Sequence, residues 1–189
     1  MREVEVKYRV QDREALLVAL TARGIEPGPP VVQDDQAYAP TTWSYGDSKT
    51  GVPFVRLRTV DGRHTFTLKR PVDNALAGDE YETAVTDRGQ MHAAILAMGF
   101  RPTVRIAKVR RTADLPDGEL CVDDVAGLGT FLEVERIVPE GVPGVAVQAE
   151  LAAFVASLGL AAIRTEETYD SLVRGATFRR QAVVGREQA

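Results

Sequence analysis

The chain begins almost at once with the stretch Glu3-Val4-Glu5-Val6-Lys7-Tyr8, which alternates charged side chains with apolar or aromatic ones. Successive side chains of a β-strand point to opposite faces, so the three charged residues share one face and the other three share the opposite face. The stretch therefore predicts a half-buried strand with a strongly charged face. One such strand is also typical of a solvent-facing sheet, so the rest of the sequence must decide between the two.

Outward from this stretch, the same period-two pattern recurs in seven further segments. They are residues 33–38, 53–60, 64–70, 79–86, 103–113, 119–124 and 130–138. Short turns such as Asp61-Gly62 and Pro116-Asp117-Gly118 join several of them, which favours antiparallel neighbours. The sequence predicts eight strands in an antiparallel meander or barrel.

Three segments have helical periodicity instead, and each ends in a glycine of the kind that terminates helices. They are residues 12–24, with Asp12 as the expected N-cap, 87–99 and 145–159. Their apolar stripes need an apolar surface to cover, and the apolar faces of the strands provide one. We therefore expect an α+β domain whose helices flank the sheet on its outside.

The charged faces of the other strands carry the functional signal. Arg, Lys and Glu, with threonines in one segment, repeat at period two: Arg56 and Arg58; Thr65, Thr67 and Lys69; Glu80 and Glu82; Lys108 and Arg110; Glu133 and Glu135. If helices cover the apolar faces, these charges point into a polar barrel interior that can hold water and a ligand. The alternative is an open sheet whose charged face meets solvent and forms ion pairs within itself.

Inside a barrel, neither set of charges would be stable without a partner. Clustered carboxylates repel one another unless a cation balances them, and clustered Arg and Lys need an anion. Carboxylate oxygens suit Mg²⁺ or Mn²⁺, which often bridge to phosphate oxygens, and arginine binds phosphate through two hydrogen bonds. The two sets together predict a triphosphate bound with its metal.

Composition limits the class of protein. The chain has 189 residues, 44% of them apolar, which is enough for one domain with a substantial core. Its net charge of −4 argues against a general nucleic-acid binder, which would need a basic face. The single cysteine, Cys121, excludes an internal disulfide, and no apolar run approaches the roughly 20 residues of a membrane span. We expect a cytoplasmic protein without nucleic-acid or membrane partners.

The motifs also resemble those of a known family. Glu3-Val4-Glu5-Val6-Lys7 looks like the ExExK signature of the CYTH superfamily, also called triphosphate tunnel metalloenzymes. It is followed in order by Arg56-Leu57-Arg58, Thr67-Leu68-Lys69, Glu80-Tyr81-Glu82, Lys108-Val109-Arg110 and an acidic segment from Asp123 to Glu135. The resemblance covers roughly residues 1–175 and leaves residues 176–189 as a C-terminal tail. It implies a single domain built as a closed eight-stranded antiparallel β-barrel, the triphosphate tunnel, with flanking helices.

The resemblance further implies roles for individual residues. The metal ligands would be Glu3, Glu5, Glu133 and Glu135, with Glu82 and Asp123 as further candidates. The triphosphate contacts would be Lys7, Arg56, Arg58, Lys69, Lys108 and Arg110, and the catalytic set would be Glu3, Glu5, Lys7, Glu133 and Glu135. Tyr169 lies in a segment similar to a family Ser-Tyr motif, with threonine in place of serine, which makes it a candidate for the tunnel mouth.

The superfamily includes class IV adenylyl cyclases, thiamine triphosphatases and inorganic triphosphatases. The run Val6-Lys7-Tyr8-Arg9 is more similar to the cyclases than to the Glu-Arg-Lys-Phe form typical of triphosphatases, so conversion of ATP to cyclic AMP and pyrophosphate is favoured. Hydrolysis of a nucleoside, thiamine or inorganic triphosphate stays open, as does a non-catalytic polyphosphate or nucleotide binder. A homodimer and a lid role for loops 39–52 and 71–78 also stay open.

Overall fold

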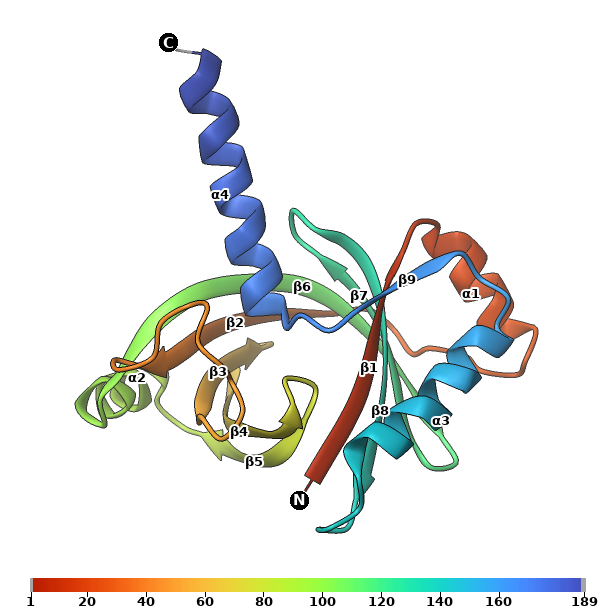
Figure 1. Cartoon of the computed structure of the whole chain (residues 1–189), viewed down its shortest axis with the longest axis horizontal. Coiled ribbons are helices and arrows are strands. Elements are labelled where there is room, and N and C mark those ends of the chain that lie inside the picture. The colour runs from red at the N-terminus through yellow and green to blue at the C-terminus, as the bar shows by residue number, and fades with distance from the viewer. Residues whose placement is uncertain (1, 188–189) are drawn as a thin grey trace.

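A computed structural model describes the backbone of residues 2–187 and the side chains of residues 2–179. Eight antiparallel strands form a closed barrel in the order β5-β4-β3-β2-β6-β7-β8-β1, with β1 pairing back to β5 (Figure 1). They are β1 (Arg2–Val10), β2 (Val31–Pro40), β3 (Phe54–Val60), β4 (Arg63–Asn74), β5 (Ala77–Val85), β6 (Phe100–Leu115), β7 (Gly118–Val125) and β8 (Gly129–Val138). The predicted closed barrel is confirmed, and the open-sheet alternative is excluded.

Strand β1 closes the barrel because it has three partner strands. One edge of β1 pairs with β8 along its whole length. The other edge is divided, since residues 2–4 pair with β5 and residues 7–10 pair with β9 (Ala162–Thr165), a short strand outside the barrel. The closing seam therefore consists of three residue pairs, and a hydrogen bond of 2.9 Å from the Glu5 backbone N–H to the Leu76 carbonyl extends it.

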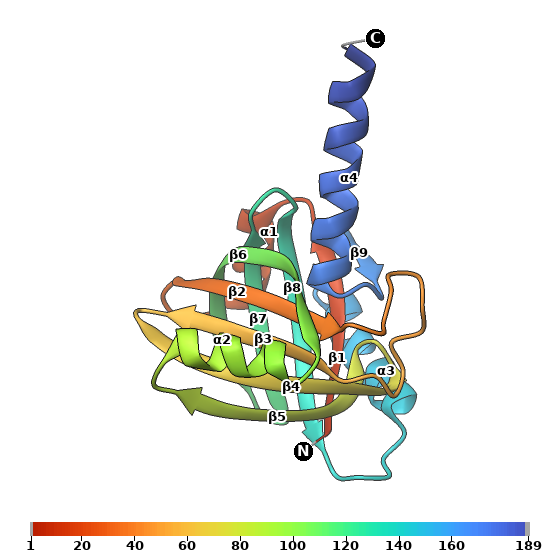
Figure 2. The ribbon, with the colours of Figure 1, turned by 90° about the vertical axis from the view of Figure 1, so that its left-hand side faces the viewer.

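Helices α1 (Arg13–Thr21), α2 (Arg88–Ala97) and α3 (Gly144–Ser157) lie on the outside of the barrel, as their apolar stripes predicted (Figures 1 and 2). α1 and α3 pack on the outward apolar side chains of β1, β7 and β8, and α2 packs on β2 and β3. Asp12 caps α1 as predicted, because its carboxylate accepts a hydrogen bond from the Ala15 backbone N–H at 3.0 Å. The charged faces of the strands point inward and line a cavity.

Helix α4 (Tyr169–Glu187) begins beside the barrel and then projects away from it (Figures 1 and 2). Its first turns pack through Leu172 and Val173 against Ile106 and Phe131 of the barrel. The segment from residue 176, expected from the resemblance to be a tail, continues this helix as far as Glu187, and residues 188–189 lie outside the described part of the chain.

Two local features differ from the sequence-based expectation. The loop expected over residues 71–78 is mostly strand, because β4 continues to Asn74 and β5 begins at Ala77. The Asn74 side chain makes this tight connection by accepting the Leu76 backbone N–H at 2.9 Å. Strand β9 was missed because its four residues show no alternation and it forms through the backbone edge of β1. Among the described helices, none combines the length and the apolar character that crossing a bilayer would require.

Candidate active site

The barrel encloses a cavity of about 470 Å³ that is lined by the charged faces of the strands. Of the twelve residues predicted for the site, eleven line it: Glu3, Glu5, Lys7, Arg56, Arg58, Lys69, Glu82, Lys108, Arg110, Glu133 and Glu135. The twelfth, Asp123, is fully buried in the wall behind Lys108 and Arg110. Alternation turns these side chains inward, and closure of the barrel brings residues more than 130 positions apart into one space.

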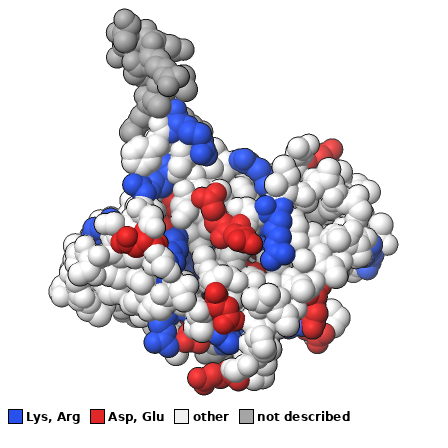
Figure 3. Space-filling view, in the orientation of Figure 1, with Lys and Arg blue, Asp and Glu red and all other residues white. Residues whose placement is uncertain are grey.

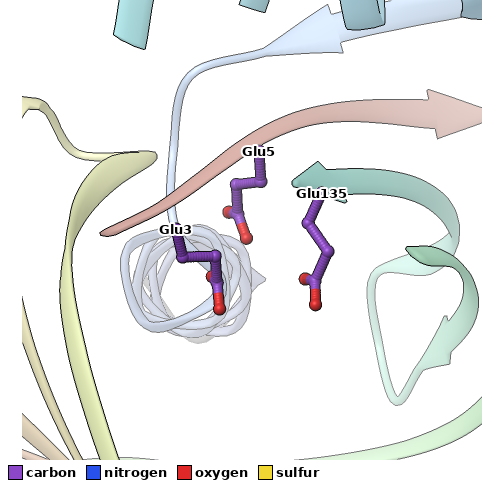
Figure 4. Close-up of side chains that lie close together, drawn as sticks. All are labelled: Glu3, Glu5 and Glu135. Atoms are coloured by element: carbon purple, nitrogen blue, oxygen red, sulfur yellow. The ribbon is translucent and has the colours of Figure 1, made fainter. Parts of the chain in front are cut away.

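Three carboxylates come together at one place in the tunnel. Glu3 and Glu5 project from β1, and Glu135 projects from β8, where its Cα is paired with that of Glu5. One carboxylate oxygen from each residue lies within 4.8 Å of the other two, and Figure 4 shows the three groups pointing into the same space. We call these residues the carboxylate triad. Converging hard oxygen donors of this kind fit a divalent cation.

The electrostatics of the carboxylate triad support that fit. Burial, followed by the charges of Glu3 and Glu5, raises the pKa of the Glu135 carboxyl to about 8. Among the described residues, no salt bridge joins Glu135 to a basic side chain. A group of three carboxylates with an uncompensated member would be stabilised by a bound cation.

The other three predicted metal ligands lie elsewhere in the tunnel. Glu133 is held between Lys7, whose Nζ lies 3.1 Å from Glu133 Oε1, and Arg110. Burial opposes ionisation of Glu133, but these two cations outweigh it and hold the pKa of the carboxyl well below its usual range. Asp123 pairs with Lys108 at 2.8 Å and with Arg110 at 2.6 Å. These carboxylates orient cations rather than joining the carboxylate triad.

Glu82 takes a third position, at the more exposed rim of the cavity. Its carboxylate accepts a hydrogen bond from the Thr67 hydroxyl at 2.9 Å and lies 3.4 Å from the Arg56 guanidinium. Glu80 lies two residues earlier on the same face of β5, 3.6 Å from Arg56 and 3.3 Å from Lys69. Both glutamates therefore face the cavity, and both contact its cations.

The six predicted phosphate contacts come from four strands: Lys7 on β1, Arg56 and Arg58 on β3, Lys69 on β4, and Lys108 and Arg110 on β6. Each has an acidic neighbour. Lys69 contacts Glu3, Glu5 and Glu80, and these charges outweigh burial to raise its pKa well above the usual range. Burial and then the charge of Arg110 lower the pKa of Lys108 to about 8. The interior is a network of ion pairs in which a polyanion and a cation can replace the internal partners.

Several cavity residues were missed by the sequence analysis, among them Asp35, Glu119 and Lys49. Asp35 of β2 is 3% exposed and holds Arg58 by two hydrogen bonds of 2.7 and 2.8 Å. Asp35 is two residues from both Gln33 and Ala37, so alternation along β2 places all three on the inward face, and this pattern could have identified Asp35. Glu119 of β7 and Lys49 of the β2–β3 loop also line the cavity. Lys49 had no such signal, because a loop residue has no periodic neighbours to assign its face.

One face of the described part of the molecule shows how charge is distributed on the outside. Figure 3 shows acidic and basic side chains interspersed over the face that it presents. Arg70 and Arg105 pair with Asp79 at 2.8 Å and Asp34 at 2.5 Å, respectively, on the outside of the barrel. Clustered charge is a feature of the tunnel interior.

Comparison with known proteins agrees with the tunnel geometry. The family model for the CYTH domain matches residues 1–169. The chain belongs to the CYTH family. A relative from Methanocaldococcus jannaschii, named "Putative adenylate cyclase MJ0240", is 27% identical over 142 residues, which are 74% of this chain and 79% of the relative.

Solved structures share the CYTH fold. The PH1819 protein of Pyrococcus horikoshii superposes with a TM-score of 0.75 at 19% identity, over 92% of this chain and 98% of that one. A Hippeastrum protein, described as a "putative adenylyl cyclase" with a dominant triphosphatase activity, superposes with a TM-score of 0.59 at 17% identity, over 92% and 95% of the two chains. The CYTH resemblance first indicated by Glu3, Glu5 and Lys7 is thereby confirmed, and CYTH proteins are enzymes that bind triphosphates.

Proposed function

We propose that this CYTH protein is a divalent-metal-dependent enzyme that binds a nucleoside triphosphate in its tunnel and converts ATP to cyclic AMP and pyrophosphate. One observation carries the proposal: three convergent carboxylates and six cationic side chains share a single cavity. A triphosphate with its metal is the ligand whose charges match both sets.

The cations would bind and align the phosphates. Arg56 and Arg58 share the inward face of β3, and Lys108 and Arg110 share that of β6, so guanidinium and ammonium groups approach the cavity from different strands. Phosphoryl and nucleotidyl transfer depend mainly on such alignment and on neutralising charge, with little covalent chemistry from the protein. In the cyclase reaction the ribose 3′-oxygen bonds to the α-phosphorus as the bond to pyrophosphate breaks, and the basic residues would retain the departing pyrophosphate.

The carboxylate triad of Glu3, Glu5 and Glu135 would hold Mg²⁺ or Mn²⁺. When bound, the metal would neutralise phosphate charge and lower the pKa of the attacking hydroxyl. Glu133 and Asp123 would keep Lys7, Lys108 and Arg110 in place until the triphosphate enters. The name of the Methanocaldococcus jannaschii relative supports the choice of cyclase.

Triphosphate hydrolysis is the second candidate. The Hippeastrum protein with the same fold is described by a dominant triphosphatase activity, and the same cations would present a terminal phosphorus to water. A non-catalytic binder is the third alternative, and the retained carboxylate triad is the feature that disfavours it.

Identifying the reaction products distinguishes the cyclase, the hydrolase and the non-catalytic binder. Purified protein is incubated with ATP, thiamine triphosphate or tripolyphosphate in Mg²⁺ or Mn²⁺, and the products are resolved by chromatography. Cyclic AMP with pyrophosphate selects the cyclase, and orthophosphate release selects the hydrolase. Tight binding without turnover of any substrate would contradict an enzymatic function.

A further inference from the structure

The loop between β2 and β3 is tied to the start of α4 through one half-buried lysine, Lys49. Lys49 Nζ donates hydrogen bonds to Thr168 Oγ1 at 2.6 Å, to both carboxylate oxygens of Asp170 at 3.0 Å, and to Ser171 Oγ at 3.1 Å. The side chains of Lys49 and Asp170 are only 14% and 19% exposed. Because Lys49, Thr168 and Asp170 all line the cavity, this tie lies at the tunnel itself.

Between Thr168 and Asp170 stands Tyr169, whose ring supports two of the predicted phosphate-binding cations. Lys7 Nζ lies 4.3 Å and Lys108 Nζ 4.9 Å from the ring centre. The Tyr169 hydroxyl donates a hydrogen bond of 2.9 Å to Asp123, the carboxylate that also pairs with Lys108. The position of one aromatic ring therefore affects two cations of the proposed triphosphate site.

A second contact joins the same loop to the same helix. The Arg174 guanidinium of α4 lies 3.7 Å from the ring centre of Tyr45 in the loop. Tyr45 in turn packs on Trp43 with ring centres 4.9 Å apart, and Trp43 packs on Phe54 at 5.0 Å. Trp43 is 5% exposed and is the only tryptophan of the chain, so its fluorescence reports on this loop.

We propose that Lys49 and Asp170 form a clasp that fastens loop 41–53 to the first turn of α4 and so holds Tyr169 against Lys7 and Lys108. The two residues are positioning residues for the triphosphate, and the inference rests on the proposed function for that ligand. Opening the clasp releases Tyr169 and weakens the binding of the phosphates. The carboxylate triad is carried by β1 and β8, outside the clasp, so metal binding is retained.

The decisive variant is Asp170→Asn, because the clasp and simple electrostatics predict opposite results. Removing a negative charge beside the cavity would by itself strengthen the binding of tripolyphosphate. Loss of the clasp weakens it instead, by about tenfold. Lys49→Met is expected to weaken binding similarly, the double variant to weaken it little further, and Lys49→Arg to retain most of the affinity.

Three measurements test the clasp in the full chain. They are calorimetric titration with tripolyphosphate in Mg²⁺, titration with Mn²⁺ alone, and the emission wavelength of Trp43 without ligand. We expect weaker tripolyphosphate binding, unchanged Mn²⁺ binding and red-shifted emission in Asp170→Asn and Lys49→Met. The matched control is Glu150→Gln, which removes the outer Arg136–Glu150 pair and should behave as wild type.

Tighter tripolyphosphate binding in Asp170→Asn, or unshifted Trp43 emission in both variants, would overturn the clasp. Failure of wild type to bind any triphosphate would instead contradict the proposed function, and the ligand-free emission would still decide whether Lys49 and Asp170 hold the loop to α4.

Discussion

At the scale of single residues, the tunnel is built from side chains that would be costly to bury alone. Glu5 is 6% exposed and has Lys7 at 3.4 Å, Lys69 at 3.7 Å and Glu135 as its strand-pair neighbour. A buried carboxylate with both cationic and acidic neighbours is stabilised only while the network is complete. This makes the roles of Glu5 and Glu135 testable one substitution at a time.

Glu5→Ala removes one of the three convergent carboxylates. We expect metal-dependent turnover to fall by at least about 100-fold while the far-ultraviolet circular dichroism stays that of the folded barrel. Initial rates across a Mn²⁺ titration check this, with Glu140→Ala, an exposed glutamate, as the control. Wild-type rates in Glu5→Ala would remove Glu5 from the site.

Glu135 predicts a pH dependence of stability in the metal-free protein. Its pKa is about 8 in the folded chain against an ordinary value of 4.5, so the native state binds a proton that the unfolded state lacks between these values. The free energy of unfolding should therefore fall as pH rises through this window, by up to about 1.4 kcal/mol per pH unit.

Urea unfolding at pH 5.5 and 7.5 measures this dependence as the difference between wild type and Glu135→Gln, which cannot titrate. The two proteins should diverge as pH rises, with wild type losing more stability. Parallel pH profiles would show that Glu135 has an ordinary pKa.

At the scale of elements, alternation along a strand decides whether an ion pair contributes to stability. Asp34 and Asp35 are adjacent on β2, and each accepts two hydrogen bonds from an arginine. Asp35 faces the tunnel and holds Arg58, whose side chain is 14% exposed. Asp34 faces outward and holds Arg105, whose side chain is 70% exposed. The two aspartates form a matched pair of sites that differ in burial.

Asp35→Ala leaves the Arg58 guanidinium largely buried without its partner, so we expect a loss of about 3 kcal/mol in the free energy of unfolding. Asp34→Ala breaks a solvated pair and should cost no more than about 1 kcal/mol. Urea denaturation of both variants at pH 7 measures the contrast. Equal losses would mean that the inward face of β2 is as well hydrated as the outward face.

At the scale of the whole molecule, the barrel depends on a seam of three residue pairs between β1 and β5. Gly78 lies in that seam opposite Glu3 and also packs tightly on β4. A Cβ atom at Gly78 would lie 2.3 Å from the Arg70 carbonyl oxygen and 2.7 Å from Pro71 Cα. Neither backbone atom can move without shifting the strand that carries it.

Gly78→Ala should therefore lower the free energy of unfolding by about 1–3 kcal/mol, because the added methyl group overpacks the seam. Gly28→Ala is the control, since the nearest atom to its added Cβ would be the Thr112 carbonyl oxygen at 3.5 Å, an ordinary contact. Thermal and urea unfolding of both variants test the difference. A neutral Gly78→Ala would show that the seam tolerates strand displacement.

Sequence by itself determined the eight barrel strands, the three outer helices and the tunnel-facing set, because all three depend on local periodicity. Glu3, Glu5 and Lys7 share a face wherever a strand forms, and the stripe containing Leu16 and Leu20 needs an apolar surface to cover. The same alternation placed eleven of the twelve predicted residues on the cavity wall.

Only the tertiary structure decided which charges meet. Strand register pairs Glu5 with Glu135 and so assembles the carboxylate triad. Glu133 lies two residues away on the same face of β8, but it forms salt bridges with Lys7 and Arg110 instead. Register and loop placement are long-range properties, so no local pattern predicts that Lys49 meets Asp170 across 121 positions. Periodicity assigns a side chain to a face, and closure of the barrel selects its partners.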